Sequence, residues 1–273
     1  VHCVVELTES GRDDRGAYAI ATASLWVDGM RIYEAKGLGM RIVAGGAPTD
    51  GLGPEGGEEV LEPDGWLADH CPTFTVPALP MMSMVDRIAG AAKALHPRRE
   101  VVAIDDIQVE RWLPVGQPVR LRSEIGERDG DRIPVTLAAW REAPRAELSR
   151  FEPVARGVVT LAPSHPDALD VAPLPPLEDA EVVPSPYEDG ALFHGPAFHK
   201  LLELSRSKGG ASATLDARAG MVPLGTLNQV LLDAATHPIP HDALHVFSEE
   251  IRPDQVAYPY RIPRMTLHRV VPT

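Results

Sequence analysis

The stretch WLADHCPTFTVPALPMMSMVDRIAGAA, residues 66–92, decides the fold class that we expect. An ionisable pair, Asp69 and His70, stands directly before an apolar segment with helical character. Its flanks include Trp66 and Phe74, and large apolar side chains of this kind are seldom found together in a solvated loop. A histidine held at the mouth of an apolar tunnel explains the pattern better, so His70 is the first candidate for chemistry.

The helix in this stretch is expected over residues 76–96, with Pro77 and Pro80 in its first turn, where a missing N–H costs little. Its apolar stripe consists of Leu79, Met82, Val85, Ile88, Ala92 and Leu95. Alternating apolar residues then predict strands over residues 101–112, 118–128, 133–142 and 155–163. One buried helix followed by an antiparallel meander is an α+β layout in which the sheet wraps around the helix.

A second helix, expected near residues 223–237, and a closing strand over 258–271 repeat this plan. The first residues read as three strands, and Asp28-Gly29 between two of them is a strong hairpin signal. The expected organisation is three strands in residues 1–45, which complete the second half or end a preceding domain, a flexible linker at 46–62, a first half at 63–162, a Pro-rich linker at 163–188 and a second half at 189–273.

Composition narrows the classes of function. The chain has 273 residues and a net charge of −13, which argues against nucleic acid and against an anionic membrane surface as partners. Two cysteines cannot build a disulfide framework, and we expect a cytoplasmic protein without a membrane span. Because the sequence begins and stops within strand-like runs, we expect it to be part of a longer polypeptide.

The second candidate for chemistry is Asp233, in LNQVLLDAATHPIP. Leu227, Leu231 and Ala234 form the core stripe of this helix, while Asp233 lies on another face. A lone carboxylate in a helix that is otherwise nearly uncharged is costly to bury without a purpose. Gln229 and His237, each one turn away, could orient it. In such a setting we expect burial to raise the pKa of Asp233 and keep a proton available.

An imidazole and a protonated carboxyl suit the elimination of water from a β-hydroxyacyl thioester. His70 would remove the proton α to the thioester carbonyl, and Asp233 would protonate the departing β-hydroxyl. Backbone N–H groups at the start of the helix after His70 would stabilise the developing enolate.

Four motifs resemble those of dehydratase domains in polyketide synthases and polyunsaturated-fatty-acid synthases. DHCPTFTVPALP resembles their His motif, LFHGPAFHKLLEL their HGPxFQ stretch with His199 in place of Gln, LLDAATH their LLDAxxQ/H motif, and YPYRIPRMTLH the strand around PFxW. In order, they cover about residues 61–273. The resemblance implies a double hotdog fold, in which two antiparallel sheets each wrap around a central helix. It carries over His70 as base, Asp233 as acid and His237 as their polar partner.

The same resemblance predicts the substrate tunnel and points to departures from the family. Gly195 and Pro196 match the loop that lines the tunnel, and Phe74 stands where the family usually has Gly. The family's Pro nine residues after the His is Leu79 here, and the PALPMM variant looks closer to the polyunsaturated-fatty-acid branch. The expected tunnel residues are Phe74, Pro77, Leu79, Gly195, Pro196 and Phe198.

The function expected from residues and resemblance together is dehydration of a β-hydroxyacyl group to an enoyl group within a multidomain synthase. The substrate would ride on the phosphopantetheine arm of an acyl carrier protein, beside neighbouring synthase domains, with no other cofactor and no metal. An isomerase or cyclase, a hotdog thioesterase and a non-catalytic pseudo-dehydratase stay open as alternatives. A homodimer is also compatible with the fold.

Overall fold

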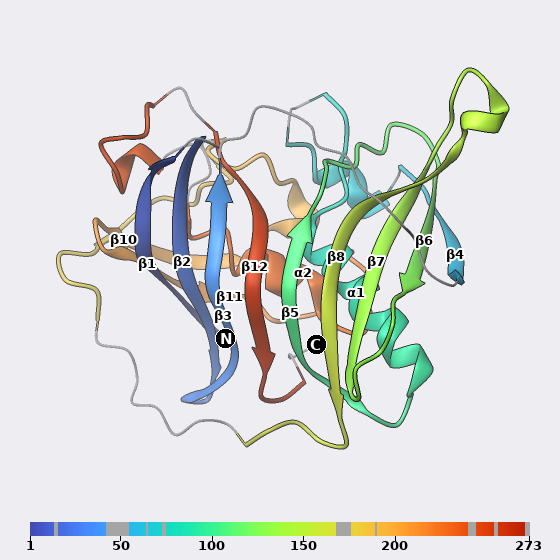
Figure 1. The fold of residues 1–273 in the computed structure, drawn as a ribbon. Helices are drawn as coiled ribbons and strands as arrows, with labels where there is room; N and C mark the ends of the chain where they lie inside the picture. The colour runs from blue at the N-terminus through green and yellow to red at the C-terminus, as the bar shows by residue number, and fades with distance from the viewer. Residues whose placement is uncertain are drawn as a thin grey trace.

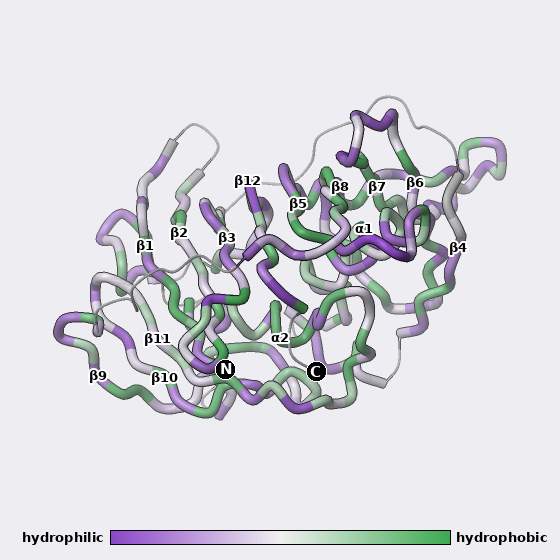
Figure 2. Tube along the Cα trace, turned by 90° about the horizontal axis from the view of Figure 1, so that it is seen from below, coloured by the Kyte–Doolittle hydropathy of each residue, from purple (hydrophilic) through white to green (hydrophobic). Residues whose placement is uncertain are grey.

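The computed structural model describes residues 1–13, 16–41, 55–63, 65–72, 75–167, 176–188, 190–239, 244–253 and 256–270. Twelve antiparallel strands form one continuous sheet, and the helices α1 and α2 lie within its curve (Figures 1 and 2). The strands follow one another across the sheet in the order β4-β6-β7-β8-β5-β12-β3-β2-β1-β11-β10-β9.

The first three strands include the hairpin that the sequence predicts at Asp28-Gly29. Asp28 and Gly29 have φ values of 51° and 77°, the positive values that a two-residue hairpin turn of the primed type needs at both positions. The turn therefore joins two long strands without splaying them. The three strands are β1 (His2–Asp13), β2 (Gly16–Val27) and β3 (Met30–Arg41).

These three strands pair with strands from the end of the chain. β1 lies beside β11 (Gly210–Leu215), and β3 lies beside β12 (Tyr258–Leu267). β12 also pairs with β5 (Glu100–Val109), so that Met265 stands between Ala35 on β3 and Ile104 on β5. The strands that were expected in two separate sheets are therefore joined into one, because β12 has a partner on both edges.

Helix α1 (Met81–Leu95) begins five residues later than the sequence predicts. The segment before it is extended, because the N–H of Leu79 donates to Leu113 O (3.0 Å) and the carbonyl of Pro77 accepts from Val115 N (2.7 Å). A proline also disfavours the helical conformation in the residue before it, which Pro80 does for Leu79. The two prolines thus end an extended segment instead of occupying the first helical turn.

Helix α2 (Gln229–Ala234) is much shorter than the predicted 223–237. Its start is fixed at Asn228, whose side chain accepts a hydrogen bond from Leu231 N, the typical N-cap contact. Buried Asp86 of α1 holds the preceding segment, since its carboxylate accepts from Leu227 N at 2.7 Å and a side chain at Gly225 would collide with it. Burial raises the pKa of Asp86. This carboxylate therefore ties α2 to α1.

One strand lies where a flexible linker was expected. β4 (Glu55–Leu61) pairs with β6 (Val119–Ile125), and Glu58 forms an ion pair with Arg120 at 2.8 Å. Its Gly- and Glu-rich sequence shows no alternation, so the prediction was wrong here. This acidic edge strand is held by its pairing with β6 and by the ion pair, while Leu61 at its end packs into the core. Residues 46–54 of the expected linker lie outside the described residues.

The remaining elements complete the two ends of the sheet. In the second half, β11 and β10 curl back beneath the sheet in Figure 2. The strands are β7 (Arg132–Arg141), β8 (Arg150–Ala162), β9 (Glu181–Val182) and β10 (Leu201–Ser207), and the 3-10 turns are η1 (Gly65–Asp69), η2 (Ala146–Leu148), η3 (Pro196–Phe198) and η4 (Leu244–Val246).

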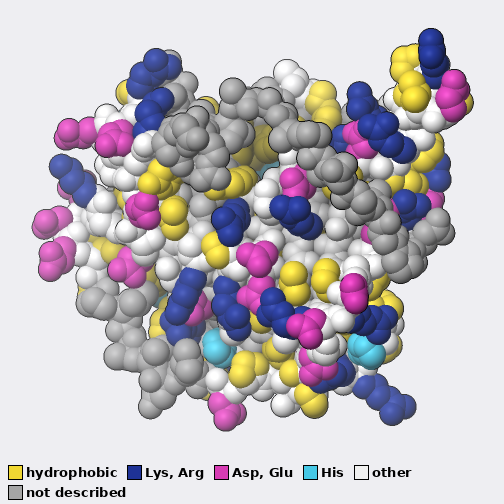
Figure 3. Space-filling model, in the orientation of Figure 1, with side chains coloured by type: hydrophobic (Ala, Val, Ile, Leu, Met, Phe, Trp, Pro, Cys, Tyr) yellow, Lys and Arg dark blue, Asp and Glu magenta, His cyan; other side chains and the backbone are white. Residues whose placement is uncertain are grey.

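The two faces of the sheet differ in polarity. On one face, α1 packs against strands β5 to β8, and these contacts form part of the apolar core. On the other face, shown in Figure 3, basic and acidic side chains intermingle over the middle strands. There Asp105 is held between Arg132 (2.7 Å) and Arg264 (3.1 Å), on three different strands. Within the described part of the chain, neither helix is long and apolar enough to cross a membrane.

Candidate active site

A mostly apolar cavity lies where the first residues of α1 approach the last residues of α2. Its walls come from both halves of the chain, including Met40 of β3. The described residues that line it are Met40, His70, Leu79, Met81, Met84, Val109, Trp112, Leu192, Phe193, His194, Asp233, Thr236, His237, Ile239, Tyr258 and Pro259. The cavity thus brings His70 and Asp233, which are far apart in the sequence, into one compartment.

His70 directly follows η1 and is held by the backbone on both sides. Its N–H donates to Leu67 O (3.0 Å), its carbonyl accepts from Ala78 N (2.9 Å), and its Nδ1 lies 2.6 Å from Ala78 O. Because a carbonyl only accepts, Nδ1 carries the proton, and Nε2 of the neutral ring holds a lone pair. Burial lowers the pKa of His70, although nearby Asp233 partly opposes this. The ring is therefore a neutral base at neutral pH.

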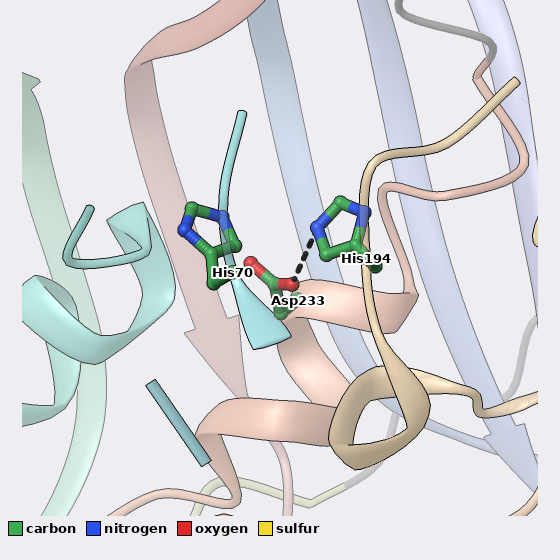
Figure 4. A group of neighbouring side chains, drawn as sticks. All are labelled: His70, His194 and Asp233. Atoms are coloured by element: carbon green, nitrogen blue, oxygen red, sulfur yellow. Dashed lines mark ion pairs between the residues drawn. The ribbon is translucent and has the colours of Figure 1, made fainter. Parts of the chain in front are cut away.

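Asp233 projects from the last turn of α2 and lies between imidazoles. Its Oδ2 is 3.1 Å from Nε2 of His237 and 3.5 Å from Nε2 of His194. A side-chain nitrogen of His70, one of His194 and a carboxylate oxygen of Asp233 all lie within 4.8 Å of one another. Figure 4 shows the carboxylate between the two rings, with its second oxygen turned toward His70.

The protonation of Asp233 differs from the sequence-based prediction. Burial alone would raise the pKa of this carboxyl, but hydrogen bonds from His194 and His237 lower it well below its ordinary value. The expectation of a raised pKa was wrong because the sequence does not reveal two imidazole N–H groups aimed at one oxygen. In the resting site Asp233 is an ionised acceptor.

His194 is a site residue that the sequence analysis passed over, although it opens the HGP motif. Its backbone pairs with His70, and its ring is buried between Phe193 (4.1 Å between centroids) and His237 (4.0 Å). Burial and the neighbouring His237 lower the pKa of His194 well below its ordinary value. Its Nδ1 has no hydrogen-bond partner among the described residues, so a second proton there would be unsatisfied. His194 is therefore a neutral donor to Asp233.

Of the two residues that were expected to orient Asp233, the structure shows one in contact with it. His237 contacts the carboxylate as predicted, one helical turn away. The amide of Gln229 instead donates to Pro223 O at 2.7 Å and supports the loop before α2. Lying on the same helix face as Asp233 did not make Gln229 its partner, because the Gln229 amide bonds to the loop carbonyl instead.

Of the expected tunnel residues, only Leu79 is among the described residues that line the cavity. Pro77 pairs with the 113–115 segment, and Phe198 packs behind His70 with ring centroids 5.5 Å apart. Gly195 and Pro196 lie in the loop that supports His194. Phe74 lies outside the described residues. Leu79 thus forms part of the wall, whereas Pro77, Gly195, Pro196 and Phe198 support it from behind.

Asp69, the partner of His70 in the opening motif, clamps this loop. Its carbonyl accepts from Gly195 N and its Oδ2 from Ala197 N, both at 2.7 Å. A Cβ at Gly195 would lie 2.5 Å from Asp69 Oδ1, so only glycine fits. The two neighbouring residues therefore have different roles. Asp69 holds the loop that carries His194, and His70 faces the cavity.

Two imidazoles and one carboxylate are ligand types that zinc accepts. In this site, however, the Nε2–H of His194 is directed at Asp233, and the Nδ1–H of His70 at a backbone carbonyl. This arrangement satisfies the three groups as a hydrogen-bonded acid–base cluster. The absence of a metal requirement stays a prediction.

Neither a family model nor a curated protein matches the sequence. Several solved structures share the fold. The dehydratase domain from the CurF module of the curacin polyketide synthase has a TM-score of 0.60 at 14% identity, over 92% of this chain and 83% of that chain. An inactive Asp-to-Asn mutant of the CurK dehydratase has a TM-score of 0.57 at 18% identity, over 78% and 81%. The dehydratase domain of PpsC from Mycobacterium tuberculosis has a TM-score of 0.53 at 22% identity, over 69% and 72%.

At these identities the likeness shows the fold alone. The chain has the fold of polyketide synthase dehydratase domains, as the motif resemblance predicts. The roles of the site residues rest on the geometry of this chain.

Proposed function

We propose that this chain dehydrates a β-hydroxyacyl thioester to the α,β-enoyl thioester. One observation carries the proposal: a neutral imidazole, His70, and a carboxyl, Asp233, meet in one apolar cavity although they come from opposite halves of the chain. The motif resemblance and the similarity in fold to dehydratase domains support the same reaction.

The chemistry follows from the two protonation sites. Nε2 of His70, whose Nδ1–H is anchored on Ala78 O, removes the proton α to the thioester carbonyl. The electron pair forms the new C=C bond, and the β C–O bond breaks as Asp233 gives its proton to the departing hydroxyl. Water leaves, His70 holds one proton, and Asp233 is ionised. Transfer of that proton to Asp233, within 4.8 Å, resets the site.

The lowered pKa of Asp233 places a condition on this cycle. Because His70 is neutral and Asp233 is ionised in the resting site, the pair must first take up one proton from solvent, which the two groups then share. An apolar acyl chain that displaces water from the cavity favours the form in which neither group is charged, since charges are costly without solvent. Substrate binding would therefore move the proton to Asp233, where elimination needs it.

The enolate-like transition state needs donors as well. Met81, the first residue of α1, lines the cavity, so the positive end of this helix dipole lies beside the reacting thioester. Backbone N–H groups there suit the thioester oxygen as negative charge develops on it.

We place this reaction on a double hotdog and in a multidomain polyketide or polyunsaturated-fatty-acid synthase, with the acyl group on the phosphopantetheine of a carrier protein. α1 within β4 to β8 would form one hotdog. α2 with β1 to β3 and β10 to β12 would form the other. The pairing of β1 with β11 and of β3 with β12 supports a second half completed by residues 1–45.

One observation favours a second candidate. An ionised Asp233 could activate water, so hydrolysis of the thioester is the rival reaction. The two are separated by mass spectrometry after incubation with a β-hydroxyacyl thioester: loss of water marks the dehydratase, and a free acid marks the thioesterase. An unchanged mass marks a non-catalytic domain, and a shifted double bond in an added enoyl thioester marks an isomerase.

Variants test the assignment in the same assay. His70→Ala and Asp233→Asn should each lower the dehydration rate at least about 100-fold, the usual contribution of a general acid or base. The matched controls are His96→Ala and Asp131→Asn, which change exposed residues outside the cavity. Wild-type rates in either active-site variant would refute the proposal.

A further inference from the structure

Tyr187, which lies in the segment expected to be a Pro-rich linker, reaches the active-site network from outside the cavity. Its ring stacks on His199 with centroids 4.2 Å apart and planes at 10°. Its hydroxyl lies 2.7 Å from Nδ1 of His237, 3.2 Å from Phe198 O and 3.4 Å from the N–H of Lys200. The hydroxyl thus contacts the side of the His237 ring that faces away from Asp233.

The direction of these hydrogen bonds can be worked out from the donors. A tyrosine hydroxyl has one hydrogen, and a backbone N–H such as that of Lys200 can only donate. If Tyr187 donates to His237 Nδ1, then the neutral ring carries its proton on Nε2 and donates to Asp233 Oδ2. If His237 carried its proton on Nδ1 instead, the bare Nε2 would face Oδ2 at 3.1 Å, and two lone pairs would repel.

Distance and charge favour the first arrangement. The contact to His237 is shorter than the contact to Phe198 O by 0.5 Å, from 3.2 Å to 2.7 Å. Among the described residues, the hydrogen bonds to the carboxylate of Asp233 come from two imidazoles, and both end on Oδ2. The charged or titratable groups around the carboxylate are His70, His194, His237 and Tyr187. Oδ2 is therefore occupied as an acceptor, and the other oxygen, Oδ1, points toward His70 (Figure 4).

We propose that Tyr187 is a positioning residue that fixes the tautomer of His237 and thereby selects Oδ1 as the oxygen of Asp233 that carries the proton. The part of this inference that concerns turnover rests on the proposed dehydration, because only there must the acid face the substrate. With Oδ2 filled by two N–H donors, a proton on Oδ1 can reach the departing hydroxyl and be replaced from His70. Without Tyr187, His237 is free to carry its proton on Nδ1 and to draw the Asp233 proton onto Oδ2, away from the substrate.

The first test reads the tautomer directly and needs no turnover. Long-range 1H–15N correlation spectra of the whole chain, with 15N-labelled histidine, distinguish the two neutral tautomers, and His237→Gln assigns the signal. We expect the proton of His237 on Nε2 in the unmodified protein, and a mixture of tautomers in Tyr187→Phe, which keeps the stacked ring. A proton on Nδ1 in the unmodified protein would overturn the proposal.

The second test is a double-mutant cycle on dehydration. Tyr187→Phe should lower kcat about 10-fold with KM nearly unchanged, because the acid is misdirected but substrate contacts remain. Glutamine has no tautomers, so in the His237→Gln background the same change should cost less than about 2-fold. Equal costs in both backgrounds would contradict the inference and indicate a purely structural tyrosine. If the unmodified protein dehydrates nothing, the proposed function fails, and the spectra still decide the role of Tyr187.

Discussion

The loop that carries His70 and the helix that carries Asp233 meet in one cavity, but different contacts hold them. His70 is fixed by backbone groups, through Leu67 O, Ala78 N and Ala78 O. Asp233 is fixed by side chains, through His194, His237 and, behind His237, Tyr187. Backbone contacts do not change with pH, whereas the imidazole contacts do. His70 is thus held by backbone groups, and Asp233 is held by side chains that include the titratable imidazole of His194.

The largest effect is expected from disturbing the clamp, in which Asp69 beside His70 holds the loop that carries His194. Gly195→Ala should lower the dehydration rate about 100-fold, because the new Cβ collides with Asp69 and a shift of about 1 Å can cost that much. Asp69→Ala removes the two closest atoms, so Gly195→Ala should cost less in that background. Rates and melting temperatures of the four proteins measure the coupling.

Two controls sharpen the clamp experiment. Asp69→Asn keeps an oxygen for Ala197 N and should retain more activity than Asp69→Ala. Gly130→Ala, in an open turn where nothing lies near the new Cβ, tests backbone strain alone and should leave the rate unchanged. If Gly195→Ala cost as much without the Asp69 carboxylate as with it, the clamp would play no part.

A smaller effect should follow from removing one donor on the Asp233 side. His194→Phe keeps a buried ring but loses the N–H that reaches Asp233 Oδ2. We expect kcat to fall about 10-fold, and the pKa of Asp233 to rise toward its ordinary value, since a hydrogen bond to the charged form is gone. The pH dependence of the rate and the 13C shift of the carboxyl measure these changes. Unchanged values of both would show that the 3.5 Å contact is not a hydrogen bond.

The pH dependence of kcat/KM tests the state of His70 in the unmodified protein. The active pair holds one proton, which it loses as pH rises through the pKa of His70. Burial lowers this pKa from 6.5, so the alkaline limb of the profile should lie below pH 6.5. Rates measured at saturating thioester concentration give this limb for the substrate-bound protein, and rates at trace concentration give it for the free protein. A limb above the ordinary histidine value would mean that His70 is not the desolvated base.

The smallest expected effect is on stability in mild acid. The folded-state pKa of His194 lies below its unfolded value of 6.5, so the unfolded chain binds more protons as pH falls below 6.5. The free energy of unfolding should therefore fall by up to about 1.4 kcal/mol per pH unit for this one group as pH falls from 6.5 toward the folded-state pKa. Urea denaturation at several pH values measures the slope. His194→Phe should flatten it, and an equal slope would assign the loss to other groups.

Several features of the fold could be read directly from local patterns. The apolar stripe of α1, the strands β5 to β8 and the Asp28-Gly29 turn depend on spacing and on backbone preferences that neighbouring residues set. β4 could not be recognised, because its acidic sequence is stabilised by β6 and Arg120. The lengths of both helices were overestimated, since hydrogen bonds to distant residues hold the segments before them outside the helix.

For the site, local sequence indicated which residue types carry the chemistry, and distant contacts decided their state. The unusual settings of His70 and Asp233 marked them without coordinates. The pKa of Asp233 and the partner of Gln229 were predicted wrongly, and His194 and Tyr187 were missed. The pKa of Asp233 and the roles of His194 and Tyr187 depend on contacts between different parts of the chain, whereas Gln229 bonds to a carbonyl of the loop just before its helix.

The sequence alone therefore determined the periodic elements, the apolar character of the core and the two side chains proposed for catalysis, because these depend on residues a few positions apart. Only the tertiary structure decided which oxygen of Asp233 is occupied, which nitrogen of each imidazole carries a proton, and what Asp69 does. These features depend on hydrogen bonds that the fold brings together, such as those from Ala197 to Asp69 and from His194 to Asp233, and a hydrogen bond acts only within a few ångströms.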